Sequence, residues 1–216
     1  MPRKYKSIQD LVLDLPLGRA RLELDLQKPL LQESDRVNID KSTIRAFHLK
    51  KFNPDAKIGP LRLYANIVKE ILDREFGRFS EIDSLADYNE FLIEQATRVS
   101  DGMNKYAGST DFVGFGRASK IFNLTCKALL RESKITKVQR EKLIRFAHVP
   151  FDSYTLQGIC LLETPVKIPL GASMGWNSLN DTKVYLQLQQ WLRDVCSEFG
   201  FVPLHYEAAV FGASAG

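Results

Sequence analysis

The sequence contains only three cysteines, and they are far apart: Cys126, Cys160 and Cys196. An odd number of widely spaced cysteines without a CxxC pair argues against a disulfide framework and against a zinc site. All three fall within apolar helical patterns. We therefore expect reduced thiols in the core of a cytoplasmic protein, associated with the nucleoid if the source is prokaryotic.

Long apolar runs are also missing, since none approaches the roughly 20 residues that are needed to cross a bilayer. The first residues, MPRKYKSIQDLVL, are basic, but neither an apolar signal core nor a small-residue cleavage site follows them. The three histidines, His48, His148 and His205, are isolated from one another. These absences predict no membrane partner, no metal and no organic cofactor.

Length and charge describe what is present. The 216 residues are 44% hydrophobic and 26% charged, which suits a single domain over 1–216, folded around a cleft. The net charge of +4 is modest, but segment 131–145 holds six basic residues against two acidic ones, and segment 41–57 holds five against one. Clusters of this kind suit a polyanion such as nucleic acid, or simply solvate the outer faces of helices.

Most of the chain shows helical periodicity, so the predicted fold class is all-α. The stretch 58–77 starts with Pro60 in its first turn and is predicted to end at Gly77. Ser84 is a natural cap for the next helix. The alternating stretch RLELDL (21–26) predicts either a short strand or an irregular arm. Further helices are predicted over 84–99, 115–133, 153–163, 180–200 (capped by Asn180) and 203–211.

The predicted helix 115–133 has one apolar face and one polar face, and the polar face carries Arg117, Lys120, Asn123 and Lys127. Three glycines precede it within GSTDFVGFGR (108–117). Glycines let backbone approach a ligand closely, and a helix N-terminus offers free N–H groups to an anion such as phosphate. The alternative is an ordinary solvated face.

A second candidate position is Asp152, within HVPFDSYTL (148–156). Aspartate is among the best N-cap residues, and a plausible helix starts at the next residue. Capping alone explains this aspartate. It is also compatible with a reactive role, because an N-cap carboxylate is fixed in direction and stays ionised beside the positive end of the helix.

Three motifs together, KIFNLTCK (120–127), HVPFDSYTL and PLHYEAAVF (203–211), resemble those of the archaeal-type 8-oxoguanine DNA glycosylases. This family is a compact branch of the helix-hairpin-helix glycosylase superfamily, and the resemblance covers 110–212. The spacing of 32 residues from Lys120 to Asp152 agrees with the family. The resemblance implies an all-α, two-lobed fold with a central cleft, and a DNA glycosylase, with associated AP lyase activity, that extrudes its target base.

By this resemblance, Lys120 is the nucleophile at C1′ of the damaged nucleotide, and Asp152 deprotonates it and stabilises charge on the sugar. Lys127 contacts the base or supports its pocket. At the positions where the family has an aspartate and a tryptophan, this chain has Glu207 and Phe211. With this departure the expected substrate is an oxidised or otherwise modified base, which includes 8-oxoguanine and the bulky modified bases of phage DNA and hence a role in phage defence.

Other candidates complete the expected site. Trp176 lies in an insertion-like segment, 163–181, and can reach the cleft from a loop. His148 is a further candidate for the base pocket, although a histidine before Val-Pro is more often a packed or capping residue. Candidate phosphate contacts, chosen by charge and by closeness to helix starts, are Lys105, Arg117, Ser119, Lys134 and Lys137.

The expected partner is DNA containing a modified base, bound by a monomer. Two alternatives remain open at this point. One is a non-catalytic DNA-binding or damage-sensing protein with the same fold, and the other is a helical protein-interaction module with no nucleic-acid role. Salt-dependent binding to duplex DNA separates the last from the other two.

Overall fold

The computed structural model describes residues 4–30, 49–168 and 179–212. Within these ranges every regular element is an α-helix and no strand occurs, which confirms the all-α prediction. The helices are α1 (Ile8–Leu26), α3 (Leu49–Phe52), α4 (Pro60–Glu81), α5 (Leu85–Ala107), α6 (Phe115–Leu129), α7 (Lys137–Phe146), α8 (Ser153–Ile159), α9 (Thr182–Glu198) and α10 (Pro203–Gly212).

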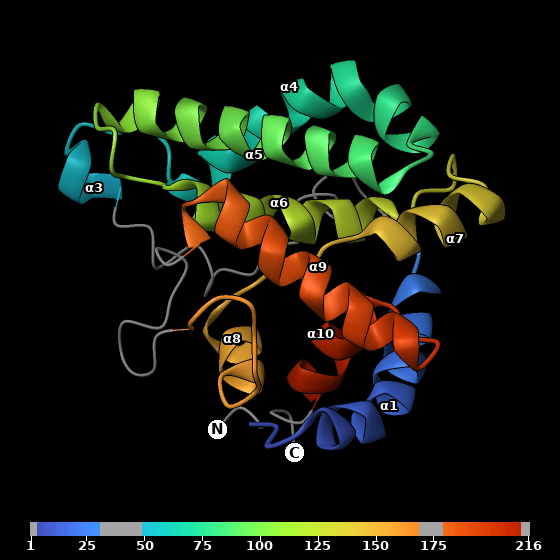
Figure 1. The fold of residues 1–216 in the computed structure, drawn as a ribbon. Coiled ribbons are helices and arrows are strands. Elements are labelled where there is room, and N and C mark those ends of the chain that lie inside the picture. Colours follow the sequence, from blue (N-terminus) through green and yellow to red (C-terminus); the bar gives the residue numbers. More distant parts are fainter. Residues whose placement is uncertain (1–3, 31–48, 169–178, 213–216) are drawn as a thin grey trace.

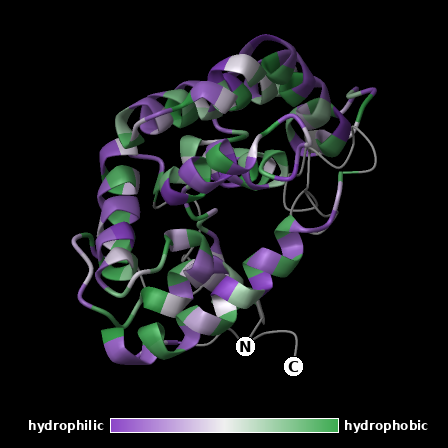
Figure 2. Ribbon diagram, turned by 90° about the vertical axis from the view of Figure 1, so that its right-hand side faces the viewer, coloured by the Kyte–Doolittle hydropathy of each residue, from purple (hydrophilic) through white to green (hydrophobic). Residues whose placement is uncertain are grey.

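The helices form two groups (Figure 1). In the upper group α5 packs against both α4 and α6, and α7 follows at one end. In the lower group α10 packs against α1, α8 and α9. Most helices have one hydrophobic and one hydrophilic side (Figure 2). The buried side chains form one connected core cluster that runs from Tyr5 to Val210, which is the arrangement of a single packed unit.

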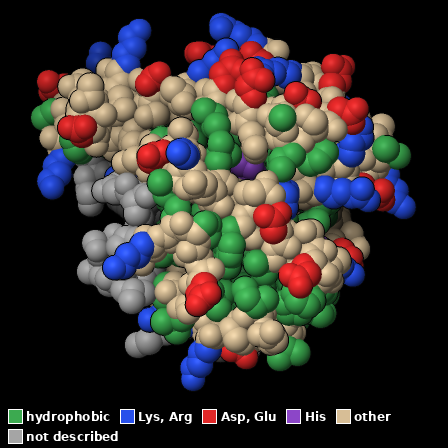
Figure 3. Space-filling model, viewed as in Figure 1, with side chains coloured by type: hydrophobic (Ala, Val, Ile, Leu, Met, Phe, Trp, Pro, Cys, Tyr) green, Lys and Arg blue, Asp and Glu red, His purple; other side chains and the backbone are tan. Residues whose placement is uncertain are grey.

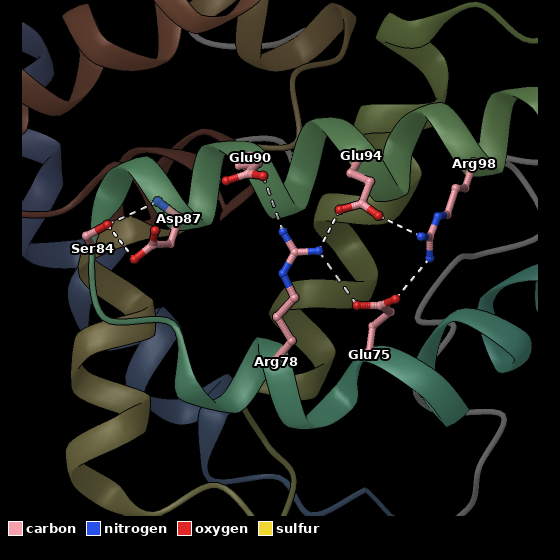
Figure 4. Close-up of polar contacts among 7 residues, drawn as sticks. All are labelled: Glu75, Arg78, Ser84, Asp87, Glu90, Glu94 and Arg98. Atoms are coloured by element: carbon pink, nitrogen blue, oxygen red, sulfur yellow. Dashed lines mark hydrogen bonds and ion pairs between the residues drawn. The ribbon is translucent and has the colours of Figure 1, made fainter.

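The α4–α5 pair is closed by a network of charges on its outer side (Figure 4). Glu94 of α5 lies 2.5 Å from Arg78 and 2.6 Å from Arg98, and Arg98 also reaches Glu75 at 3.1 Å. Ser84 caps α5 as predicted, because its hydroxyl accepts from the N–H of Asp87. These partly exposed pairs link the two helices and contribute little each to stability.

Several predicted helix ends were wrong: the helix predicted over 84–99 continues as α5 to Ala107, and the one predicted over 115–133 ends at Leu129. Helix α4 continues through Gly77 to Glu81, because the next turn buries Phe79 completely and this burial outweighs the helix-breaking tendency of glycine. The predicted helix 153–163 ends earlier, at Ile159.

The prediction for 21–26, a strand or an irregular arm, was wrong, since these residues complete α1. Leu11, Leu15 and Leu22 recur at helical spacing on its buried side, whereas the alternating Leu24 is exposed. The helix is held by α10. A Cβ on Gly18 would come within 1.9 Å of the His205 carbonyl oxygen, so only glycine permits this approach.

The cysteines are free, as expected. Cys126 and Cys196 are buried in the core, and Cys160 is half-buried at the end of α8.

Candidate functional site

The polar side of α6 is not a solvated face. Lys120 is 7% exposed and Asn123 is 2% exposed. The helix lies between neighbours on several sides: it packs against α5, and the buried hydroxyl of Tyr64 in α4 donates to the carbonyl of Ile121 at 2.9 Å. A helix that buries lysine and asparagine must supply partners for them, because an unpaired polar group in the interior costs free energy.

The start of α6 differs from the prediction. The N–H of Gly116 donates to Asn180 Oδ1 at 3.0 Å, so the amide of Asn180 occupies part of the helix end that we expected to be free for an anion. A Cβ on Gly114 would lie 2.5 Å from the same oxygen. The glycine therefore makes room for Asn180. Helix α9 is capped instead by Asp181, whose side chain accepts from Lys183 and Val184.

Asp152 caps α8, as predicted. Its Oδ1 accepts from the N–H groups of Tyr154 and Thr155, each at 2.9 Å, and its own N–H donates to the hydroxyl of Thr155 at 2.8 Å. These reciprocal bonds form a capping box and fix the plane of the carboxylate.

The second oxygen of Asp152 faces Lys120, also as predicted. Lys120 Nζ lies 3.3 Å from Asp152 Oδ2, and the two side chains are only 8% and 6% exposed. One carboxylate thus divides its oxygens between a helix end and an ammonium group. The arrangement can hold a lysine in a fixed direction and accept a proton from it.

The stretch before Asp152 is anchored to α9. The side chain of Gln189 both accepts from the N–H of Val149 at 3.0 Å and donates to its carbonyl at 2.8 Å. The ring of Phe151 packs edge-on against Tyr185. Tyr206 of α10 holds α8 from the other side, because its hydroxyl donates to the carbonyl of Thr155.

His148 does not face a substrate pocket in this structure. Its side chain is buried, with Nδ1 2.9 Å from the Tyr185 hydroxyl and Nε2 2.8 Å from Asn89 Oδ1. Burial, together with the positive charge of Arg193, holds the pKa of His148 well below its usual range. The ring is therefore a neutral, packed group, which is the more common reading of such a histidine.

The two other candidates for base recognition contact each other. Lys127 Nζ lies 2.8 Å from Glu207 Oε2, and Asp25 of α1 is 3.9 Å away. Burial opposes the charge of Lys127, but attraction to Glu207 and Asp25 outweighs it and raises the pKa of the lysine. Glu207 itself is 3% exposed. In this conformation the two residues close a buried ion pair between α6 and α10.

Phe211 follows one turn after Glu207 on α10 and is 39% exposed. Its ring centroid lies 6.1 Å from that of Tyr154, the second residue of α8. Two aromatic rings thus lie together at the surface beside the helix that Asp152 caps. Trp176, which we expected nearby, lies outside the described residues.

The expected phosphate contacts are spread over the molecule. Ser119 is buried and its hydroxyl donates to the carbonyl of Gly116, so it does not face solvent. Arg117 is half-buried, and burial lowers its pKa. Lys105 lies at the end of α5 that adjoins the start of α6, whereas Lys134 and Lys137 follow the far end of α6, about 22 Å along its axis.

Much of the basic segment 131–145 is engaged internally. Arg131 donates to the carbonyls of Lys28 and Pro29, and Arg140 donates to the carbonyl of Leu130. Lys142 pairs with Asp83. Figure 3 shows acidic side chains among the basic ones over α7 and over the α4–α5 pair. The charge that remains for a polyanion is smaller than the sequence count indicates.

Two surface hollows lie away from Lys120 and Asp152. One, of about 440 Å³, separates the ends of α7 and α9. The other, of about 780 Å³, is open and polar, and it is lined by Ser100, Asp101, Asn104, Lys105, Gly108, Ser109 and Thr110.

Among the described residues, no three His, Cys, Asp or Glu side chains are grouped as metal ligands would be. No helix in the same ranges is long and apolar enough to span a membrane.

Sequence reasoning missed the residues that hold the site together. Asn180, Tyr185 and Gln189 all belong to α9 or its lead-in, and they position the start of α6 and the stretch before α8. Tyr185 and Gln189 are polar residues on the buried side of α9, and the sequence pattern alone gives little indication of their hydrogen-bond partners. Asn123 was noted only as part of a polar face.

Comparison with known proteins adds no relative to this description: no family model, no curated protein and no solved structure matches the chain.

Proposed function

We propose that this protein is a DNA glycosylase that excises a modified base through Lys120 and Asp152, with associated AP lyase activity. The observation that carries the proposal is the buried contact between these two side chains, 3.3 Å apart. The resemblance of the three sequence motifs supports it, and so does the capped geometry of Asp152, which directs one oxygen at Lys120.

The proposed reaction uses each group once. Lys120 passes a proton from its ammonium group to Asp152 Oδ2, and its nitrogen lone pair then forms a bond to C1′ of the extruded nucleotide. The bond between C1′ and the base breaks, and the base leaves with the electron pair and takes up the proton that Asp152 had accepted. The C1′–O4′ bond then breaks, O4′ takes up a proton released from the Lys120 nitrogen, and a Schiff base forms on Lys120. Loss of a proton from C2′ and of the 3′-phosphate by β-elimination nicks the strand.

The free-energy cost of burying this ion pair favours a role in catalysis over a role in stability. Removing two charges from water costs several kcal/mol per ion, and a buried ion pair is often no more stabilising than apolar residues of similar volume. Asp152 needs no lysine to cap α8, because its Oδ1 already accepts both N–H groups. A lysine held next to a fixed proton acceptor is, by contrast, what a Schiff-base reaction requires.

Access to Lys120 sets a condition on the substrate. With 8% of its side chain exposed, the amine meets C1′ only when an extruded nucleotide enters beside α8, where Tyr154 and Phe211 offer aromatic surface for stacking. The polar hollow at the end of α5 offers Lys105 and a turn of small residues to a phosphate. Because α5 and α6 are neighbours in the fold, contacts between this hollow and the DNA backbone keep the bound DNA strand close to the start of α6.

Reductive trapping tests the proposal. The protein is incubated with duplexes carrying an abasic site or a modified base, together with borohydride, which reduces the Schiff base to a stable amine. We expect a covalent adduct with the wild type and none with Lys120→Gln. Lys69→Gln, an exposed lysine of α4 with no expected DNA contact, is the matched control and should trap like the wild type.

The other outcomes are equally definite. Trapping by Lys120→Gln at the wild-type level would assign the nucleophile elsewhere. Salt-dependent duplex binding without any adduct would favour the non-catalytic DNA-binding alternative, and absence of DNA binding would leave the helical interaction module.

A further inference from the structure

Asn123 has an unused hydrogen-bonding atom in the interior. Its side chain is 2% exposed, and its Nδ2 donates to the hydroxyl of Tyr185 at 2.9 Å. Its Oδ1 has no hydrogen-bond partner among the residues that the structure describes. A buried acceptor without a partner costs free energy, and where a protein keeps one, a functional role or a bound water or ion accounts for it.

A chain of hydrogen bonds fixes the direction of this amide. Asn89 Oδ1 only accepts, so Nε2 of His148, 2.8 Å away, carries the proton. Because burial lowers the pKa of His148, the ring holds no second proton, and Nδ1 accepts from the hydroxyl of Tyr185. The Tyr185 oxygen is then an acceptor for Asn123 Nδ2, and the amide cannot turn without breaking this chain.

The position of Asn123 connects it to Lys120. It lies three residues after Lys120 and four before Lys127, so the three side chains share one side of α6. Lys120 is paired with Asp152, and Lys127 is paired with Glu207. Asn123 lies between them on the helix, and of these three side chains it is the one with an unused hydrogen-bond acceptor.

We propose that Asn123 Oδ1 accepts a hydrogen bond from an N–H group of the base that is excised at Lys120, and that it thereby selects bases with a donor at this edge. This inference rests on the proposed glycosylase function. Tyr185, His148 and Asn89 act as positioning residues that hold the acceptor toward the base. The ligand class is a nucleobase with an amide-type N–H, such as the lactam edge of an oxidised or deaminated purine.

The experiment separates base recognition from Schiff-base chemistry. Asn123→Leu keeps the branched shape and the number of side-chain heavy atoms and lacks the acceptor. Two reactions are measured: borohydride trapping on a duplex with a single abasic site, and base release from duplexes with 8-oxoguanine, hypoxanthine or 5-hydroxymethyluracil. We expect trapping on abasic DNA within about twofold of the wild type and a loss of base release of about 10- to 100-fold.

Two further variants test the details. Asn123→Asp keeps an acceptor and, when protonated, also the donor to Tyr185, so it should retain more base release than Asn123→Leu and improve as the pH falls. Tyr185→Phe frees the amide to turn and should reduce discrimination among the three bases. Thr125→Val, a buried polar residue that bonds Tyr64 on another side of α6, is the matched control and should leave both reactions unchanged.

The failures can be told apart. A wild type that never traps abasic DNA refutes the proposed function itself. If abasic DNA is trapped but no base is released from any of the three duplexes, Lys120 keeps its role and the role of Asn123 is refuted. Three results with the variants would also refute the role of Asn123. Asn123→Leu could lose both reactions equally, or it could release the base as well as the wild type does. The third result is an Asn123→Asp variant that releases no more base than Asn123→Leu.

Discussion

Lys127 of α6 and Glu207 of α10 form a buried ion pair, with Nζ and Oε2 2.8 Å apart. The family resemblance implied that Glu207 contacts the base and that Lys127 contacts it or supports its pocket, and each is the other's partner in this conformation. A base that uses Glu207 must therefore compete with Lys127 or share the carboxylate with it. The pair also joins the C-terminal helix to the helix that carries Lys120.

Removing one member of this pair should be strongly destabilising. Lys127→Met leaves Glu207 buried without a counter-charge, and we expect the free energy of unfolding to fall by about 3 kcal/mol. The double variant Lys127→Met/Glu207→Leu should recover most of that loss. Asp25→Asn is the control: Asp25 is 3.9 Å away and 34% exposed, so its loss should cost less than about 1 kcal/mol. Urea denaturation measures these three variants together with Glu207→Leu, and strictly additive effects of the two single changes would contradict the coupling.

The capping role of Asp152 can be separated from its pairing with Lys120. Asn and Ala substitutions both remove the charge that faces Lys120, but asparagine is as good an N-cap as aspartate. We expect the free energy of unfolding of Asp152→Ala to be about 1 kcal/mol lower than that of Asp152→Asn. Base release should be lost in both variants. Denaturation and trapping are measured on the same preparations. Full base release by Asp152→Asn would show that its carboxylate only caps α8.

Acid should destabilise the fold through two histidines. Burial lowers the pKa of His205 to about 4 and that of His148 well below 6.5. The unfolded chain binds both protons near pH 6.5 and the folded chain does not, so their contribution is complete above pH 6.5 and is lost as the pH falls toward 4. Each histidine adds a slope of up to about 1.4 kcal/mol per pH unit.

Denaturation between pH 7 and pH 5 checks this slope, because carboxyl groups with a lowered pKa, such as that of Glu94, stay ionised over this range. His205→Asn should reduce the slope by about half. Stability that does not change over this range would mean that both rings take up protons in the folded state.

The contact between α1 and α10 predicts a large effect from one methyl group. Gly18→Ala forces the helices apart, because its Cβ would meet the His205 carbonyl oxygen, and we expect a loss of at least about 2 kcal/mol. Gly77→Ala is the matched control in another helix: its Cβ meets nothing within 4 Å, so better helix propensity should stabilise the protein by up to about 1 kcal/mol. If the packing is as described, thermal denaturation should give a lower melting temperature than that of the wild type for Gly18→Ala and a higher one for Gly77→Ala.

Binding to duplex DNA should depend on Lys105 more than on Lys137. Lys105 lines the polar hollow beside the start of α6, whereas Lys137 is 87% exposed and has Glu141 3.9 Å away. We expect Lys105→Ala to reduce the slope of log K against log salt by about 0.9 and Lys137→Ala to change it less. Equal changes in the two variants would indicate a contact surface that extends over the whole length of α6.

Local signals in the sequence predicted local structure well. The caps at Ser84 and Asp152, the start of α4 at Pro60 and the facing of Asp152 toward Lys120 are all observed. Each depends on a few neighbouring residues or on a spacing that a helical hairpin can close.

Features decided by distant contacts could not be read in this way. Alternation in 21–26 indicated a strand, but packing against α10 favours a helix there. Asn180 was assigned to the nearest helix and in fact accepts from the N–H of Gly116, 64 residues earlier, at the start of α6. The pairing of Lys127 with Glu207 spans 80 residues, and no local pattern distinguishes a paired lysine from a solvated one.

The packing of α1 against α10 has a consequence for how the chain reaches this structure. Helix α1 is synthesised before α10, but its Gly18 surface is completed only by residues near His205, more than 180 positions later. Contacts of such long range form slowly because the whole intervening chain must be brought together first. Until α10 has left the ribosome, we expect Leu11, Leu15 and Leu22 to lack the cover that α10 gives to α1, and exposed apolar surface of this kind is prone to aggregation.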